Sequence, residues 1–158
     1  MIRKNSSKSA FTLVEILIVV IILGILAAIV IPQFTEASND ARLSALQNDL
    51  QTVRSQLELY KVQHLDNYPA AATLVSQLTS RTDIIGNVMA TGGDPTKFPL
   101  GPYLQKFPTN GFNSLTTVES GTAAVAGDNT TGWYWDTTQN KFSPNDNLTN
   151  NGVADDSL

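Results

Sequence analysis

The sequence of 158 residues contains no cysteine. This absence excludes disulfide frameworks, thiolate metal sites and cysteine nucleophiles. Histidine occurs once, as His64, so a zinc site would need carboxylates to complete its shell. We expect His64 to be a surface or interface residue with no functional role. The sequence also lacks a nucleophile elbow, a phosphate loop and a dinucleotide fingerprint, and we therefore expect no enzymatic activity.

Positive charge is scarce. Ten lysines and arginines stand against 14 acidic residues, which gives a net charge of -4. Three of the cations, Arg3, Lys4 and Lys8, precede the first apolar segment, so the remainder of the chain carries 7 − 14 = −7. An acidic body lacks the positive footprint of a nucleic-acid-binding protein, and we expect no nucleic-acid partner.

Residues 11–32, FTLVEILIVVIILGILAAIVIP, form a long apolar segment. As a helix, residues 16–31 cover about 24 Å, and residues 11–14 extend the segment to the length that spans a membrane. The preceding basic residues place the N-terminus in the cytoplasm. A cleaved secretory signal and a plain signal anchor are alternative interpretations. Neither explains Glu15, because a charge near the centre of a membrane span costs at least ~2.5–3.5 kcal/mol and calls for a partner.

Residues 33–66 are predicted to form an amphipathic helix, continuous with the apolar segment and kinked at Pro32. Its apolar stripe recurs every three or four positions and consists of Leu43, Leu46, Leu50, Val53, Leu57 and Tyr60. The run Asp-Asn-Tyr-Pro at 66–69 is predicted to end this helix.

Residues 67–143 are predicted to form the rest of a globular part. A short helix is expected at 70–80, an ordered loop rich in Gly and Pro at 82–114, and short strands at 115–119, 122–126, 133–136 and 141–143. Residues 144–158 form a polar tail. The expected fold class is α+β, with a long, kinked N-terminal helix packed on a small antiparallel sheet.

The N-terminal residues SKSAFTLVEILIVVIILGILAAIVIPQF resemble those of type IV prepilins and type II secretion pseudopilins, which share a short basic leader, an FTLVE run and a long aliphatic stretch. Further along, DNYP, GPYLQKFP and GWYWD are similar to the major pseudopilin of type II secretion. The resemblance implies a pilin-like, ladle-shaped fold and a structural subunit of a filament that serves protein export.

Carried over by position, the resemblance implies that residues 1–10 are a leader and that prepilin peptidase cuts between Ala10 and Phe11. Phe11 would then be N-methylated, and Glu15 would pair with the amino terminus of a neighbouring subunit during assembly. Gly24 and Pro32 would provide flexibility and a kink. The sequence departs from the family at Ala10, where members usually have glycine.

The resemblance also implies a location and partners. The subunit would sit in the inner membrane as a single-pass protein with its C-terminal domain in the periplasm, and would then enter a periplasmic or extracellular filament. Its partners would be prepilin peptidase, further copies of itself, an inner-membrane assembly platform and minor pseudopilins. Alternatives are a type IV pilus pilin for adhesion, motility or DNA uptake, and a non-assembling single-span protein with an exterior ligand-binding domain.

The oxygen-rich tail allows two interpretations. Asp146, Asp155 and Asp156 are candidate ligands for Ca²⁺, and the resemblance implies a C-terminal calcium site. The spacing of an EF-hand is not met, and no bidentate glutamate follows. The other interpretation is a solvated tail with too little apolar content to fold.

Overall fold

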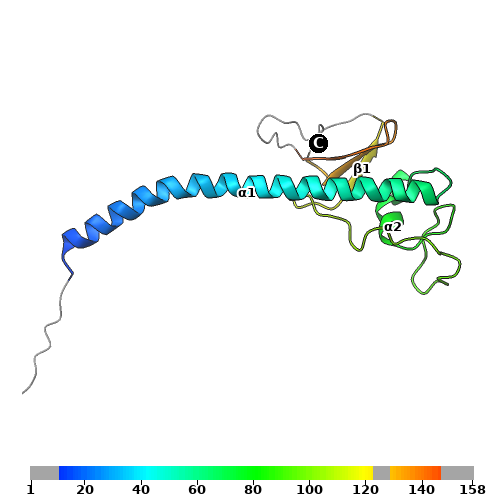
Figure 1. Ribbon diagram of the computed structural model, residues 1–158, viewed down its shortest axis with the longest axis horizontal. Helices are drawn as coiled ribbons and strands as arrows, with labels where there is room; N and C mark the ends of the chain where they lie inside the picture. The colour runs from blue at the N-terminus through cyan, green and yellow to red at the C-terminus, as the bar shows by residue number, and fades with distance from the viewer. Residues whose placement is uncertain (1–10, 123–128, 147–158) are drawn as a thin grey trace, which may run out of the picture. The chain divides into compact units, whose positions relative to one another are not determined.

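The computed structural model describes residues 11–122 and 129–146. In these ranges the elements are α1 (Leu13–Gln63), a 3₁₀ turn η1 (Ala71–Thr73), α2 (Leu74–Thr79) and the strands β1 (Val118–Gly121), β2 (Trp133–Asp136) and β3 (Lys141–Pro144) (Figure 1). The predicted α+β class is therefore confirmed. The chain divides into two compact units, residues 1–40 and residues 41–158, and α1 contributes to both.

Helix α1 passes through Pro32 without interruption, as the sequence predicted. Proline has no backbone N–H, so the carbonyl four residues earlier, at Ala28, loses its usual helical partner. One turn later, the Thr35 hydroxyl donates a hydrogen bond to the Ile31 carbonyl at 3.1 Å. A kink at Pro32 stays a prediction.

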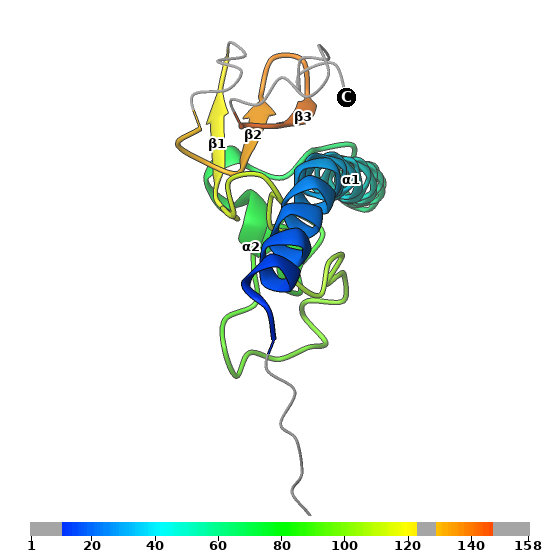
Figure 2. The same cartoon turned by 90° about the vertical axis from the view of Figure 1, so that its left-hand side faces the viewer.

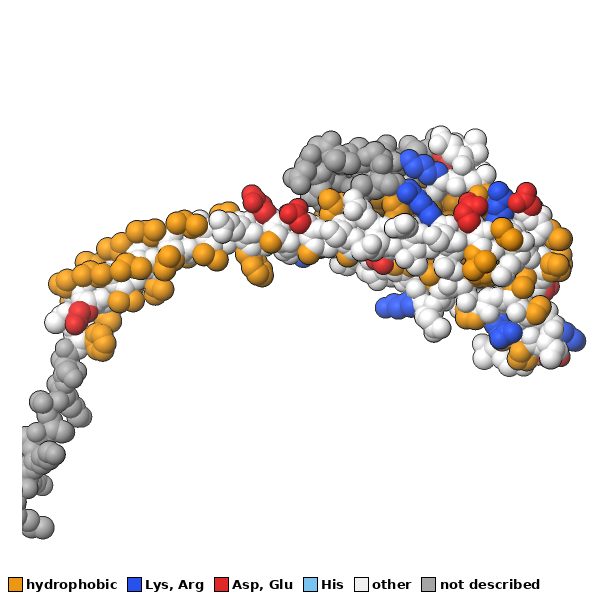
Figure 3. All heavy atoms as spheres, in the orientation of Figure 1, with side chains coloured by type: hydrophobic (Ala, Val, Ile, Leu, Met, Phe, Trp, Pro, Cys, Tyr) orange, Lys and Arg blue, Asp and Glu red, His pale blue; other side chains and the backbone are white. Residues whose placement is uncertain are grey.

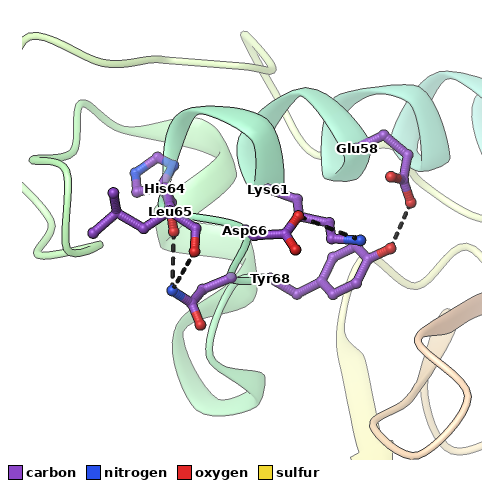
Figure 4. Close-up of polar contacts among 7 residues, drawn as sticks. Glu58, Lys61, His64, Leu65, Asp66 and Tyr68 are labelled. Atoms are coloured by element: carbon purple, nitrogen blue, oxygen red, sulfur yellow. Dashed lines mark hydrogen bonds and ion pairs between the residues drawn. The ribbon is translucent and has the colours of Figure 1, made fainter.

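The C-terminal end of α1 is fixed by its own loop (Figure 4). Leu65 and Asp66 adopt left-handed backbone angles (φ 54° and 66°), and the Asp66 amide donates back to the Lys61 carbonyl at 3.0 Å. The Asn67 side chain donates to the carbonyls of His64 and Leu65, both at 3.1 Å. These bonds satisfy carbonyls that a helix end leaves open, so α1 ends at Gln63, just before the predicted stop.

The core lies in the unit formed by residues 41–158. The helical stripe predicted from periodicity is buried from Leu46 onward, whereas Leu43 is half-buried. Opposite it lie Trp133, Trp135 and Phe142 of the sheet and Leu74 and Leu78 of α2. The ring of Trp133 stacks on Phe142 with centroids 5.3 Å apart, and its indole N–H donates to the Pro108 carbonyl at 3.0 Å. This pairing satisfies the polar atom of a fully buried tryptophan.

The three strands lie side by side in the order β1-β2-β3 (Figure 2). β2 and β3 are antiparallel, as predicted, but β1 and β2 are parallel, so the sheet is mixed. Residues 122–132 between them can span up to about 36 Å, enough for the chain to return to the starting end of β1. β1 begins at Val118 instead of residue 115, and most of the strand predicted at 122–126 falls outside the described residues.

Candidate functional site

The N-terminal part of α1 is apolar on all sides. From Leu13 to Ile31 its large side chains are between 51 and 81 % exposed, and hydrophobic atoms dominate the face of this segment that Figure 3 shows. A Cβ at Gly24 would meet no atom within 4 Å. By length and composition, α1 can cross a membrane. Within the described chain no other element covers this surface, so it requires a membrane or other protein chains.

Glu15 lies at the N-terminal end of this helix and forms a capping box with Thr12. The backbone N–H and the hydroxyl of Thr12 both donate to Glu15 Oε2 at 2.8 Å, and the Glu15 N–H contacts the Thr12 hydroxyl at 3.3 Å. Because α1 begins at Leu13, Thr12 occupies the N-cap and Glu15 the third helical position. A carboxylate here also interacts favourably with the helix dipole. The prediction for Glu15 missed this local role, although the spacing Thr-x-x-Glu is a recognisable sign of it.

The other predicted assembly residues are placed only in part. Phe11 precedes the helix and is 80 % exposed. Ala10, on the other side of the predicted cleavage bond, lies outside the described residues. In the structure Glu15 is hydrogen-bonded to Thr12 of its own helix. The pairing of Glu15 with Phe11 of another subunit stays a prediction.

His64 is buried inside the unit that carries the core, whereas a surface or interface position was expected. Only 2 % of it is accessible, and its ring stacks on Tyr60 with centroids 3.6 Å apart. Nδ1 lies 2.8 Å from the Tyr60 carbonyl, which can only accept, so Nδ1 carries the proton. Nε2 lies 3.0 Å from the Thr82 hydroxyl, within hydrogen-bond distance. His64 therefore joins the end of α1 to the loop that follows α2.

Among the predicted calcium ligands, Asp146 is described, and Asp155 and Asp156 lie outside the described residues. Asp146 is 3 % exposed; its Oδ2 accepts a hydrogen bond from the Asn110 amide, and its Oδ1 has no partner among the described residues. A buried carboxylate oxygen without a donor suits a hard cation such as Ca²⁺. In the described ranges no three Asp, Glu, His or Cys side chains come together, so Asp146 fits as one ligand of an incomplete set.

Comparison with known proteins links this helix to a family. Residues 5–31 match the model of the prokaryotic N-terminal methylation motif. A relative from Pseudomonas aeruginosa named type II secretion system core protein G is 34% identical over 109 residues, which cover 68% of this chain and 70% of the relative. A protein of the same name from Vibrio cholerae is 28% identical over 129 residues, covering 78% and 81%.

A third protein of this name, from Dickeya chrysanthemi, is 31% identical over 100 residues, covering 62% of this chain and 59% of the relative. No solved structure gives a significant match. The similarity to the Pseudomonas aeruginosa protein extends well beyond the apolar helix, because 109 matched residues must include much of the unit that carries the core. The chain therefore belongs to the family of type II secretion system core protein G.

Proposed function

We propose that this chain is a pseudopilin, the structural subunit of a type II secretion filament. One observation carries the proposal: an N-terminal methylation motif lies on a helix segment whose apolar side chains are exposed on every side. The rest of the chain has its own core and needs nothing from this segment to bury its apolar residues. A subunit of this design can keep the segment in a membrane and later bury it among other copies. The shared name of the relatives favours this function over a type IV pilus pilin.

Glu15 is proposed to pair with the amino group of Phe11 in a neighbouring subunit. Two opposite charges attract strongly between packed apolar helices, and either one alone is costly to bury. The pair would therefore fix the axial register of the subunits. Because Glu15 also caps its own helix, replacing it by alanine removes both roles at once.

Glu15→Gln separates the two roles, since glutamine at this position of a capping box still accepts the Thr12 hydrogen bonds but carries no charge. We expect Glu15→Gln to enter the membrane fraction at the parental level and to be lost from sheared filaments. Glu36→Gln, an exposed carboxylate further along α1, is the matched control and should assemble normally. Filaments of Glu15→Gln at the parental yield would contradict the pairing.

Processing is proposed to occur between Ala10 and Phe11, followed by N-methylation of Phe11. Incubation with prepilin peptidase and mass spectrometry test this directly, with Ala10→Gly as the matched substrate that has the residue usual in the family. Recovery of the intact 17.0 kDa chain, under conditions in which Ala10→Gly is cut, would contradict the proposed site.

The remaining assignments follow from the proposed function. The subunit would be anchored in the inner membrane with residues 41–158 in the periplasm, would contact an assembly platform and minor pseudopilins, and would have no catalytic activity. Protease added to spheroplasts should then remove the unit that contains Trp133 and leave the membrane segment protected. Protection of Trp133 in intact spheroplasts would contradict this orientation.

Asp146 is proposed to provide one carboxylate oxygen to a bound Ca²⁺. Calcium would supply a positively charged partner for the buried Oδ1, which has none among the described residues. It would stabilise the folded state, because the site exists only when the chain is folded. Thermal unfolding should shift upward with calcium in the parent and not in Asp146→Asn. Asp94→Asn, an exposed carboxylate, is the control and should keep the shift. A calcium response retained by Asp146→Asn would contradict the assignment.

A further inference from the structure

A tight turn at residues 83–86 presents two adjacent isoleucines to solvent. Ile84 is 53 % and Ile85 72 % exposed. They occupy the two central positions of the turn, because the Gly86 amide donates to the Asp83 carbonyl at 3.0 Å. Such positions favour Gly, Pro, Asn, Asp or Ser, so two β-branched aliphatic residues are there against local preference. We call Ile84 and Ile85 the turn patch.

The turn patch is held rigidly by its own hydrogen bonds. The carboxylate of Asp83 accepts from the Ile85 amide at 3.1 Å and from the Asn87 amide and side chain, both at 2.8 Å. The turn is also tied to the core, because the buried Gln77 side chain donates to the Gly86 carbonyl at 2.6 Å. Its isoleucines are therefore pre-ordered for contact, which lowers the entropy lost when a partner binds.

A second apolar patch lies on the outer face of α1. Leu59 and Val62 are 43 % and 77 % exposed and are neighbours three positions apart. At about 100° per residue, Val62 points nearly opposite to Tyr60, which faces the core, and Leu59 points to the side. The turn patch lies on the core side of α1, since a Cβ at Gly86 would come within 2.7 Å of the Tyr60 hydroxyl. We call Leu59 and Val62 the helix patch.

These patches account for nearly all exposed large aliphatic side chains in the described part of residues 41–158, with Leu65 as the remaining one. The turn patch offers on the order of 200 Å², far below the ~800 Å² per partner of an independent stable interface. It therefore suits a contact that is repeated within an assembly whose main interface lies elsewhere. A contact between two different patches of identical chains is heterologous, and it extends into an open filament when its rotation does not close a ring.

We propose that the turn patch of one subunit packs on the helix patch of a second copy of this chain in the filament. The inference rests on the proposed function, because the apolar part of α1 has to supply most of the association. The turn–helix contact adds a second point of attachment between the exposed units. It would hold each exposed unit in a defined orientation relative to its neighbour in the filament.

The absence of cysteine makes this contact directly testable by cross-linking in the full chain. In filaments of Val62→Cys/Ile85→Cys, oxidation should join each copy to the next and give a ladder of dimers, trimers and longer species. Each single-cysteine variant should give no ladder. The matched control is Val62→Cys/Thr91→Cys, in which the second cysteine is in another exposed turn, and it should stay monomeric.

Filaments without a 62–85 ladder would overturn the contact and leave the proposed function intact. Dimers formed by Ile85→Cys alone would also overturn it, because they would show that the turn patch contacts itself or another partner. Failure of the unsubstituted chain to form filaments would contradict the proposed function, and the contact with it.

A second measurement needs no cross-link. Ile84→Ser/Ile85→Ser should raise the concentration required for polymerisation roughly tenfold or more, since two apolar side chains lose their burial. Leu65→Ser also removes an exposed leucine, but outside both patches, and should polymerise like the parent. The thermal midpoints of both variants should match the parent, because exposed side chains contribute little to folding. Equal polymerisation of the double variant and Leu65→Ser would overturn the proposal.

Discussion

Gly132 provides a sharp test of the packing around the sheet. A Cβ at this position would overlap the carbonyl oxygen of Leu115 and lie 2.7 Å from its carbonyl carbon. Both are backbone atoms, and they are fixed, because the same oxygen accepts a hydrogen bond from the Asn110 amide at 2.9 Å. Gly132 is fixed as well, since its N–H donates to the Thr117 carbonyl at 3.0 Å and its carbonyl accepts from Asn145 at 3.1 Å.

Gly132→Ala is therefore expected to destabilise the folded state, which is the opposite of the usual effect of replacing glycine by alanine. Where alanine fits, replacing glycine stabilises by about 0.4–1 kcal/mol, because the unfolded chain loses conformational freedom. Here the methyl group must displace backbone that holds two loops together. Overpacking of this kind costs about 3 kcal/mol or more when the surroundings cannot move, which lowers the thermal midpoint by roughly 10 °C in a unit of this size.

Tryptophan fluorescence measures this effect in the full chain in detergent, since both tryptophans lie in β2 directly after Gly132. The matched control is Gly111→Ala. A Cβ at Gly111 would meet its nearest atom, Cβ of Arg42, at an ordinary 3.9 Å, so this variant should be neutral or slightly stabilised. If the midpoints of Gly132→Ala and Gly111→Ala agree within about 2 °C, the fixed-backbone reasoning is wrong.

Two further predictions concern buried polar groups. Gln77→Met keeps the side-chain shape but removes the acceptor for the Ala70 amide and the donor to the Gly86 carbonyl. Urea unfolding should therefore show a free energy of unfolding lower by about 2 kcal/mol. Gln51→Met, at an exposed position, is the control and should show no loss. Burial, with the nearby Tyr103, raises the pKa of Tyr60 to about 12, and the pKa values of Tyr68 and Tyr103 are raised as well. An absorbance titration should therefore show tyrosines ionising late, and Tyr60→Phe should reduce that late step by one tyrosine. The folded state then holds this proton more tightly than the unfolded chain, so stability is retained below pH ~10 and falls as the pH rises toward ~12; a titration with no late step contradicts the burial.

The sequence predicted the features that depend on local spacing. The apolar stripe of α1 repeats every three to four residues, and this alone identifies Leu50, Val53 and Leu57 as core residues. The stop after α1 is encoded in the run Asp-Asn-Tyr-Pro at 66–69, which begins three positions after the last helical residue. The Thr12–Glu15 capping box also follows from local spacing, because Thr and Glu are three positions apart at the start of the helix.

Features that depend on contacts far apart in the chain were not predictable in the same way. The parallel pairing of β1 with β2 depends on the path of the intervening chain, for which strand propensity carries no information. Burial of His64 depends on Thr82, 18 positions away, and on a stack with Tyr60 that periodicity cannot distinguish from an exposed position. The rigid turn that carries the turn patch could not be predicted for a similar reason, because the Gln77 side chain that holds it belongs to another element, α2.

The hydrogen bonds of Glu15 leave one of its two carboxylate oxygens open to a partner. Both Thr12 donors end on the same oxygen, Oε2, and Oε1 receives no hydrogen bond among the described residues. An incoming ammonium group can therefore approach Oε1 without competing for the cap. In the proposed pairing of Glu15 with Phe11 of another subunit, the first turn of the helix need not unravel, and the pairing would add no unfolding barrier to the growth of the filament.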